Sequence, residues 1–277
     1  MRRRVARYLH GGDAGTSNQV ITFAGDYQTW TEAQRASDGY DTPVILERTF
    51  ASLQRVKRGD AVFERDSVLF DTPQYSFPVL TALLRAALEG RSRLSVADVG
   101  GSLGSSYFQC RSLLQAVDIV EWSVIEQAAY VRCGREHFED RELRFYETID
   151  ECRAERQPGV LLLSGVLQYL PDPYSALEQL LSHRLPHVIV DRTAFLASGR
   201  DRLTVQTVPD NIYPASYPAW FLSEGRVVGC LRAAGYGVVY GFPALDTLSP
   251  IDEAAYYKGL VCEYQPGTAA SADESGR

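Results

Sequence analysis

Short apolar segments alternate with amphipathic segments of helical length over most of the chain from residue 94 onward. The apolar or alternating segments predict seven strands: Leu94–Val99, Val120–Glu126, Leu143–Glu147, Gly159–Ser164, His187–Asp191, Val238–Phe242 and Tyr257–Tyr264. Helices are expected after the first strand, over about Gln127–Phe138, from near Pro173, and in the segment ending at Gly235. This order predicts an α/β fold, a doubly wound and mostly parallel seven-stranded sheet whose last two strands are neighbours.

The chain before residue 90 has a different pattern, which predicts helices. Thr31 is expected to cap a short helix that ends at Gly39, and a weakly periodic helix follows from about Tyr40 to Val56. A third helix, about Phe77 to Leu88, has an apolar stripe formed by Leu80, Leu83, Leu84, Ala87 and Leu88. We therefore expect a helical N-terminal cap over residues 1–90, the main domain over 91–265 and a disordered tail over 266–277.

The turn after the first main-domain strand is rich in glycine. It reads Asp98, Val99, Gly100, Gly101, Ser102, Leu103, Gly104, and it leads into a helix. The G-x-G-x-x-G dinucleotide fingerprint fails in both registers. The acid-x-Gly-x-Gly-x-Gly pattern of S-adenosylmethionine (SAM) binding folds does fit, with Ser102 in the place of the middle glycine. A turn whose glycines serve only close packing is the alternative.

In open α/β sheets, ligands bind outside the carboxyl ends of the strands, so the residues after each strand are the candidates. Glu126 ends the second strand, 22 residues beyond Gly104. A carboxylate there can accept hydrogen bonds from both ribose hydroxyls, although a solvated acid is the alternative. Ser164 and Gly165 end the fourth strand and precede two candidates for the reaction chamber, Gln168 and Tyr169.

Asp191 and Arg192 end the fifth strand and point to the same crevice. Asp191 is the better candidate for a general base, with a tyrosine second, and a structural Asp191–Arg192 ion pair is the alternative. His137, His183 and His187 fall at the far edge of the sheet, which leaves only His10 as a histidine that could fold over the site.

A long loop over residues 193–223 is expected to carry substrate specificity. Its aromatic residues Tyr213 and Tyr217 could face a sulfonium centre, whose positive charge aromatic rings attract. For Trp220 and Phe221 an anchoring role in a hydrophobic plug is favoured.

The composition limits which classes of partner, compartment and metal site are expected. A net charge of −7 and a pI near 5.2 argue against nucleic acid as the main partner. No run approaches the roughly 20 apolar residues of a membrane span, and no signal-peptide core follows the basic start. Five scattered cysteines without a C-x-x-C pair indicate a cytosolic, reduced protein, and no histidine spacing predicts a metal site.

With these pieces assembled, the chain resembles an uncharacterised bacterial family described as SAM-dependent methyltransferases of the class I Rossmann-like group. The matching segments are Tyr27–Asp41, Asp98–Gln109, Trp122–Gln127, Ser164–Pro173, Val190–Thr193 and Ile212–Phe221. The resemblance implies SAM as cofactor and S-adenosylhomocysteine as product, and many members look like parts of surface-polysaccharide or natural-product pathways. Two departures matter: Ser102 replaces a usual glycine, and Gln168–Tyr169 stand where related enzymes often carry histidines.

By this resemblance, Asp98 and the glycine loop would border the methionine part of SAM, Glu126 the ribose, and Gln168–Tyr169 the reaction chamber. The cofactor-binding residues expected are Asp98, Gly100, Gly101, Ser102, Gly104, Tyr107, Glu126, Gln127, Ser164 and Gly165. The catalytic candidates are Gln168, Tyr169, Asp191, Arg192, Tyr213 and Tyr217.

Three functions stay open at this point. The first is methyl transfer to a hydroxyl or amine of a small molecule or of a glycan or natural-product precursor. The second is a cyclisation or alkyl transfer that consumes SAM and releases methylthioadenosine. The third is a non-catalytic binding protein that inherited the fold. The sequence also leaves a homodimer open.

Overall fold

The computed structural model describes residues 21–39, 42–65, 67–72, 74–209, 215–246 and 251–266, and its main sheet has the seven predicted strands. The sheet order is β11-β12-β8-β7-β4-β5-β6. Its members are β4 (Arg93–Val99), β5 (Ile119–Ile125), β6 (Leu143–Tyr146), β7 (Val160–Ser164), β8 (His187–Leu196), β11 (Tyr236–Pro243) and β12 (Ala255–Tyr264). β12 runs antiparallel to both of its neighbours, whereas β4 to β8 are parallel to one another. The mostly parallel, doubly wound prediction is confirmed.

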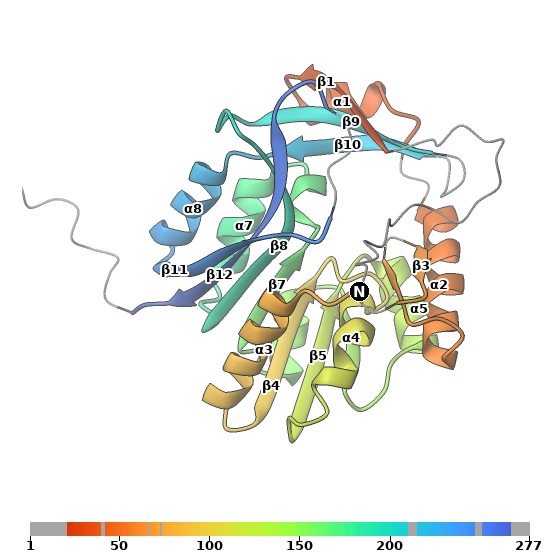
Figure 1. The fold of residues 1–277 in the computed structure, drawn as a ribbon, viewed down its shortest axis with the longest axis vertical. Coiled ribbons are helices and arrows are strands. Elements are labelled where there is room, and N and C mark those ends of the chain that lie inside the picture. Colours follow the sequence, from red (N-terminus) through yellow and green to blue (C-terminus); the bar gives the residue numbers. More distant parts are fainter. Residues whose placement is uncertain are drawn as a thin grey trace, which may run out of the picture.

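Helices cover both faces of this sheet, and successive strand residues feed two separate cores. On β4, Val96 packs in the core beneath α3 (Phe77–Glu89), α4 (Ser105–Cys110) and α5 (Ala128–His137). Its neighbour Ala97 packs in the core of the opposite face, which is covered by α6 (Ile149–Glu155), α7 (Pro173–Leu181) and α8 (Glu224–Ala233). The pattern did not predict α6, which is short and begins where the Thr148 side chain accepts a hydrogen bond from Glu151 N–H. Figure 1 shows the two layers.

The N-terminal region is not helical throughout, which corrects the sequence prediction. The helices α2 (Thr42–Arg58) and α3 are present as expected. However, β1 (Thr22–Tyr27), β2 (Phe63–Arg65) and β3 (Val68–Phe70) are strands. The first of them pairs with β9 (Arg202–Val208), far away along the chain. A local pattern contains no information about such a partner.

Two smaller expectations about these helices are also wrong. Thr29, not Thr31, caps α1 (Trp30–Arg35), because Thr29 and Glu32 exchange hydrogen bonds in a capping box. On α3, Leu84 and Leu88 lie outside the buried stripe, with exposed fractions of 36% and 79%. The helix contacts the sheet over a narrower face than its apolar composition indicates.

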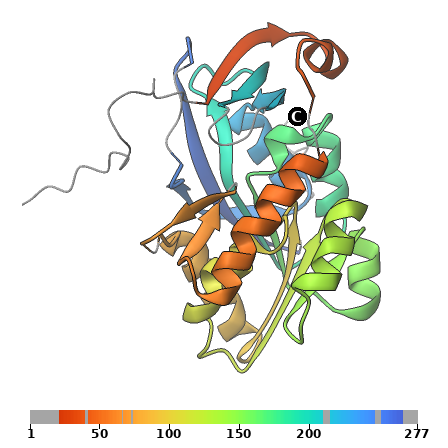
Figure 2. The same cartoon turned by 90° about the vertical axis from the view of Figure 1, so that its right-hand side faces the viewer.

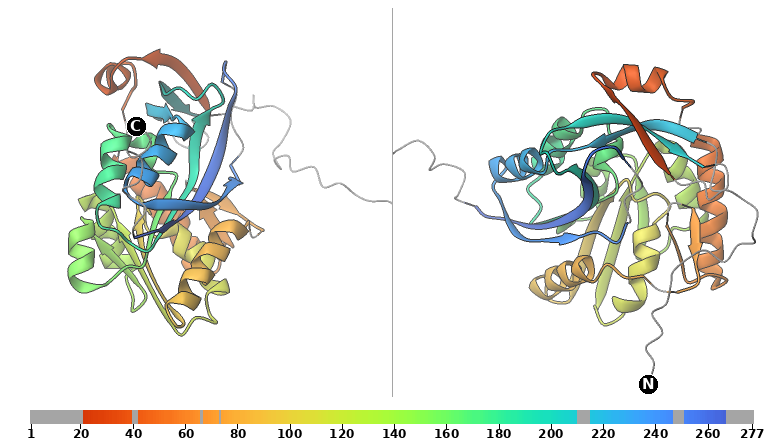
Figure 3. Two further views of the ribbon diagram at one scale, coloured as in Figure 1. Left: turned by 90° about the vertical axis from the view of Figure 1, so that its left-hand side faces the viewer. Right: turned by 45° about the horizontal axis from the view of Figure 1, so that its top comes forward.

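The insert after β8 is a sheet instead of the expected loop. β9 pairs with β1 on one side and with β10 (Ala215–Phe221) on the other, all antiparallel. Leu203 and Val205 pack against Ala33 of α1 on the outer face, while the opposite face carries Gln206 and Tyr217. Figures 1 and 3 show this sheet beyond the ends of β7 and β8, with α1 above it.

α2 connects this second sheet to the main domain. Its Ile45 packs with Val208 and Tyr217, whereas Leu53 and Val56 lie in the core with α4 and α5. Figure 2 shows the helix running across that face of the molecule. The carboxyl edge of the main sheet is therefore walled by α2 and by the second sheet.

Some expectations cannot be compared with this structure. Residues 1–20 of the expected N-terminal cap, residues 267–277 of the expected tail, His10 and Tyr213 all lie outside the described residues. Within the described part of the chain, none of the helices combines the length and the apolar character needed to cross a bilayer. The same residues contain no cluster of three metal-ligating side chains.

Candidate functional site

The glycine loop between β4 and α4 turns back over the end of β5. Gly100 has a φ of +71° and donates its N–H to the Ile125 carbonyl oxygen at 2.9 Å. Gly104, with a φ of +97°, precedes α4 and donates to the Gly101 carbonyl at 2.9 Å. Ser102 also adopts a left-handed conformation, with a φ of +56°. The loop therefore needs glycine, or a residue able to tolerate positive φ, at three of its positions.

We expect Gly100→Ala to destabilise the protein by about 2 kcal/mol or more, because both the backbone and the available space oppose a side chain. An added Cβ would lie 2.5 Å from Cγ2 of Val166 at a φ of +71°. Urea unfolding followed by circular dichroism measures the effect. Gly159→Ala is the matched control, since its Cβ would meet only the Ser95 carbonyl oxygen at 4.0 Å. Equal stability of the two variants would contradict the requirement for glycine at position 100.

Glu126 follows β5 directly and is joined to the glycine loop. Its carboxylate accepts hydrogen bonds from its neighbour Gln127 N–H, at 2.7 Å, and from the backbone of Ser102. Burial raises the pKa of Glu126 above its ordinary value, although these two hydrogen bonds act in the opposite direction. Ser102 thus contributes its backbone to the placement of the acid, a contact that does not depend on its side chain. The side chain of Gln127 itself is exposed.

Asp98 lies beneath the loop and is almost completely buried, with 1% of its surface exposed. Its Oδ2 accepts a hydrogen bond from Trp122 Nε1 at 2.9 Å, while Oδ1 has no partner among the residues described. A Cβ on Gly101 would lie 2.6 Å from the Asp98 carboxyl carbon, so glycine there makes room for the acid. Burial raises the pKa of Asp98 to about 7; the Trp122 hydrogen bond lowers it, and the charge of Glu126 raises it.

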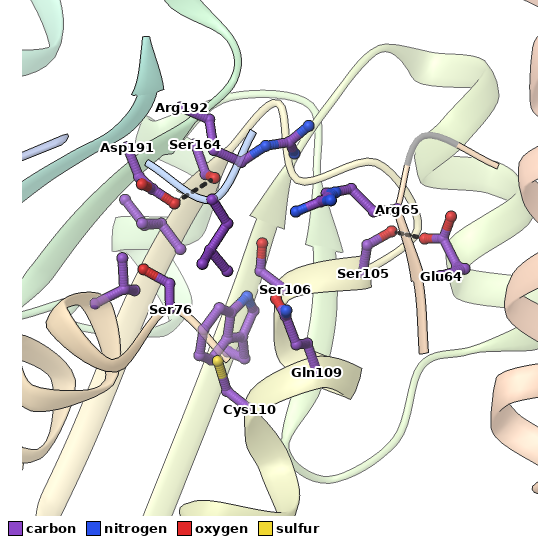
Figure 4. A pocket seen from close by; sticks show the side chains of 14 residues that line it. Glu64, Arg65, Ser76, Ser105, Ser106, Gln109, Cys110, Ser164, Asp191 and Arg192 are labelled. Atoms are coloured by element: carbon purple, nitrogen blue, oxygen red, sulfur yellow. Dashed lines mark hydrogen bonds between the residues drawn. The ribbon is translucent and has the colours of Figure 1, made fainter. Parts of the chain in front are cut away.

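A pocket opens beside these acids, on the face of the sheet that carries α3 and α4 (Figure 4). β2, α3, α4, the end of β7 and the middle of β8 all contribute to its lining, including Ser76, Ser105, Ser106, Gln109 and Cys110. A hydrogen bond joins β2 to the start of α4, because the Ser105 hydroxyl donates to the Glu64 carboxylate. The pocket is therefore assembled from segments that lie far apart in the sequence.

Asp191 brings a buried carboxylate into this pocket. Its Oδ2 accepts a hydrogen bond from the Ser164 hydroxyl at 3.2 Å, and its Oδ1 has no partner among the described residues. Gly165, at a φ of +66°, donates its N–H to the Asp191 carbonyl oxygen at 3.0 Å, which joins the end of β7 to the middle of β8. Burial raises the pKa of the Asp191 side chain, and the charge of Arg192 acts against it. A carboxylate with a raised pKa is a better proton acceptor.

Arg192 makes its close ion pair elsewhere. Its Nε lies 2.8 Å from Oδ2 of Asp246, a residue that follows β11. The Asp191–Arg192 ion pair that the sequence left open is thus accompanied by a close contact of Arg192 with another acid, although the charge of Arg192 also acts on Asp191. Gln168 donates its Nε2 to the Arg192 carbonyl oxygen at 3.0 Å, so it supports the backbone behind the pocket.

Tyr169 and Tyr217 meet between the main domain and the second sheet. Their ring centroids lie 5.7 Å apart. The Tyr169 hydroxyl donates to Oε1 of Gln206 at 3.0 Å, and Nε2 of Gln206 donates to the Tyr217 hydroxyl at 3.1 Å. This network favours a positioning role for both tyrosines over the catalytic role expected from the sequence.

Tyr107 differs most from its expected place. It is buried in α4, and its hydroxyl donates to Glu142 at 2.8 Å, just before β6. Burial and the Glu142 contact both raise the pKa of Tyr107. Of the expected cofactor contacts, only Ser164 is among the residues that line the pocket, so the role of Tyr107, like that of the others, stays a prediction.

The sequence reasoning also missed residues that the structure brings to the site. Arg65 lines the pocket from β2, and Gln206 joins the two tyrosines. Ser105 was next to the glycine loop and could have been found there. Arg65, Asp246 and Gln206 had no local signal, because each reaches the site only through long-range pairing.

No protein-family model matches this chain, and no curated protein is similar to it. The comparison with solved structures finds methyltransferases at low sequence identity. Human N-acetylserotonin methyltransferase in complex with SAM is 16% identical over 67% of this chain and 51% of its own, with a TM-score of 0.45. The chain thus spans about half the length of that enzyme.

Two further structures match a larger share of their own length. Magnesium protoporphyrin IX methyltransferase from Synechocystis PCC 6803 with bound SAM is 13% identical over 82% of this chain and 99% of its own, at a TM-score of 0.45. A SAM-bound amino pentose methyltransferase from Micromonospora echinaspora is 10% identical over 69% and 92%, at 0.44. The strand order and the antiparallel β12 define the architecture here, a mostly parallel seven-stranded sheet of the class I methyltransferase type.

Proposed function

We propose that this protein is a SAM-dependent methyltransferase that acts on a hydroxyl or amine of a small molecule or of a glycan or natural-product precursor. The observation that carries the proposal is the junction of the glycine loop with Glu126. A carboxylate at the end of β5 accepts hydrogen bonds from the backbones of Ser102 and Gln127. This junction presents an acid and a glycine-rich backbone together, as recognition of a ribose and its adjoining chain requires.

The residues present also fit the polar end of such a cofactor. The absence of a side chain at Gly101 lets the Asp98 carboxyl group pack directly against the loop backbone, which places an acid beside the loop. The pocket beside the loop contains the buried Asp191, whose Oδ1 lacks a partner among the described residues. Buried acceptors without partners are rare, and a ligand that donates hydrogen bonds would satisfy them.

When bound, SAM would supply an electrophilic methyl group. This chain's contribution would be to align donor and acceptor and to exclude water, which by itself accounts for much of the rate of such transfers. We assign proton removal from the acceptor to Asp191, because it lines the pocket and its pKa is raised. Ser164 would orient this carboxylate through its hydroxyl.

Calorimetry with SAM and with S-adenosylhomocysteine tests the proposal. We expect both to bind with dissociation constants in the micromolar range, about −8 kcal/mol. Absence of binding by either compound at millimolar concentration would overturn the proposal. Product analysis then separates the chemistries: S-adenosylhomocysteine marks methyl transfer, whereas methylthioadenosine would mark an alkyl transfer or cyclisation.

A further inference from the structure

Two arginines lie at the same opening of the pocket and share one carboxylate. Arg192 Nε lies 2.8 Å from Oδ2 of Asp246, and Arg65 Nε lies 3.9 Å from Oδ1 of the same residue. Figure 4 shows both guanidinium groups over the pocket, one from β2 and one from the segment of β8. All three side chains are mostly buried, with exposed fractions of 19%, 22% and 18% for Arg65, Arg192 and Asp246.

The backbone directs these side chains to the opening. Arg192 has a φ of +51°, a conformation that non-glycine residues rarely adopt. Its guanidinium carbon lies 3.6 Å from the position that a Cβ on Gly165 would take, so it passes directly over the end of β7. Arg65 stacks over the Phe70 ring, 5.2 Å from the centroid, and also donates to Gln74. Unfavourable backbone geometry in a binding cleft is a common mark of a functional residue.

The charged side chains of the pocket include both basic and acidic groups. Burial alone would raise the pKa of Asp246, but Arg192 and Arg65 together keep it below its ordinary value. Two acids line the pocket with the arginines. Glu64 accepts hydrogen bonds from Ser67 N–H and from the Ser105 hydroxyl, whereas Asp191 is 5% exposed and has an unpartnered oxygen among the residues described. Two guanidinium groups beside a buried carboxylate are complementary to an α-amino-carboxylate group.

We propose that Arg65 and Arg192 bind the carboxylate of the donor's amino-acid end, and that Asp246 takes this carboxylate's place while no ligand is bound. The inference rests on the proposed function, since it concerns the methionine portion of SAM. Arginine is well suited to the role because its planar guanidinium pairs with carboxylates through two parallel hydrogen bonds. Asp246 supplies the same chemical group from within the chain, so it competes with the ligand for the same two partners.

The test compares S-adenosylhomocysteine with methylthioadenosine, which has the same nucleoside but lacks the amino-acid group. We expect Arg192→Met to weaken binding of S-adenosylhomocysteine by about tenfold or more and to change binding of methylthioadenosine by less than about twofold. Arg65→Met should act in the same direction with a smaller effect, because its contact with Asp246 is longer. Arg85→Met is the matched control: Arg85 pairs with Glu89 and Glu263 near the start of β8, at the opposite edge of the sheet.

Asp246→Asn tests the competition directly. Removal of its charge should strengthen binding of S-adenosylhomocysteine several-fold and leave methylthioadenosine unchanged, because the two arginines lose an internal partner. Weaker or unchanged binding of S-adenosylhomocysteine to this variant would overturn the competing role of Asp246. Because each variant is measured with both ligands, a general loss of folding lowers both affinities and is recognised as such.

The outcomes separate this inference from the proposed function. If the wild-type protein binds neither ligand, the proposed function fails. If the wild-type protein binds S-adenosylhomocysteine, the proposed function stands. The arginine site is then wrong if Arg192→Met weakens binding of S-adenosylhomocysteine and methylthioadenosine equally, or changes neither affinity. If Arg192→Met does not fold, Arg65→Met and Asp246→Asn decide the question by the same comparison.

Discussion

Replacement of Glu126 by glutamine is expected to weaken binding of S-adenosylhomocysteine by about 10- to 100-fold. The carboxylate can accept two charge-assisted hydrogen bonds from a ribose, each worth roughly 1.5–3 kcal/mol, whereas an amide retains one acceptor oxygen without the charge. The fold should tolerate the change, since the amide oxygen can still accept from the backbones of Ser102 and Gln127. Isothermal titration calorimetry at pH 8 measures the affinity.

Glu121→Gln is the control for this experiment. Glu121 lies on the same strand but pairs with Arg93 at 2.9 Å, away from the glycine loop. We expect its affinity for S-adenosylhomocysteine to equal that of the wild type. Equal losses in both variants would mean that the effect is one of stability or net charge, and the assignment of Glu126 to the ribose would be wrong.

The second large effect expected is on stability, at Asp98. Burial raises the pKa of this residue from 3.8 to about 7 in the folded protein. A raised pKa favours the protonated form, so its contribution to stability is fully present below about pH 4 and is lost as the pH rises to about 7. Asp98→Asn is neutral at every pH. The stability of the variant relative to the wild type should therefore rise between pH 4 and pH 8 by on the order of 4 kcal/mol, about 1.4 kcal/mol for each pKa unit.

Urea unfolding of both ligand-free proteins across this pH range gives the difference directly. At low pH, the difference in unfolding free energy between the two proteins depends on how well the amide fits. The change of this difference with pH reports the ionisation of Asp98. Asp252→Asn is the control, because Arg202 lowers the pKa of the exposed Asp252 and its charge is not lost as the pH rises. A difference that stays constant from pH 4 to pH 8 would contradict an elevated pKa at Asp98.

At neutral pH the buried Asp98 therefore lowers the stability of the protein, as is common for residues that are retained at a binding site for function. The Asn variant should bind S-adenosylhomocysteine about tenfold more weakly, although it is the more stable protein at neutral pH. In the wild-type protein, Oδ1 of Asp98 lacks a partner among the residues described. A bound ligand, or a water molecule that accompanies the ligand, would donate a hydrogen bond to this atom.

The main sheet could be predicted from the sequence because its signals are local. β7 is almost continuously apolar, and the glycine loop follows β4 with an acid and three glycines at short spacing. Each strand of the parallel sheet is joined to the next by a short crossover, so sequence order constrains spatial order. The same holds for Glu126 and Ser164, which lie at the ends of β5 and β7. Asp191 lies beside Ser164 as expected, but it does not end its strand, because β8 continues to Leu196.

The second sheet could not be predicted in this way. β1 pairs with β9 across a long separation in the sequence. The residues of β1 also lack the alternation of apolar and polar positions that would indicate a strand. Pro218 and the aromatic cluster made the β10 segment look like a loop, but its backbone pairs with β9 throughout. The hydrogen bonds of Tyr169 and Tyr217 could not be predicted for the same reason, because Gln206 of β9 bonds to both hydroxyls.

The sequence by itself determined the parallel core, the glycine loop and the acids that follow its strands, because period, turn residues and spacing are properties of neighbouring positions. Only the tertiary structure decided that Ser102 supports Glu126 with its backbone, that Asp98 is buried under Gly101 against Trp122, and that Arg65, Arg192 and Asp246 meet at one opening. Burial and long-range contact set these arrangements. Both depend on which segments the folded chain brings together, which no local pattern specifies.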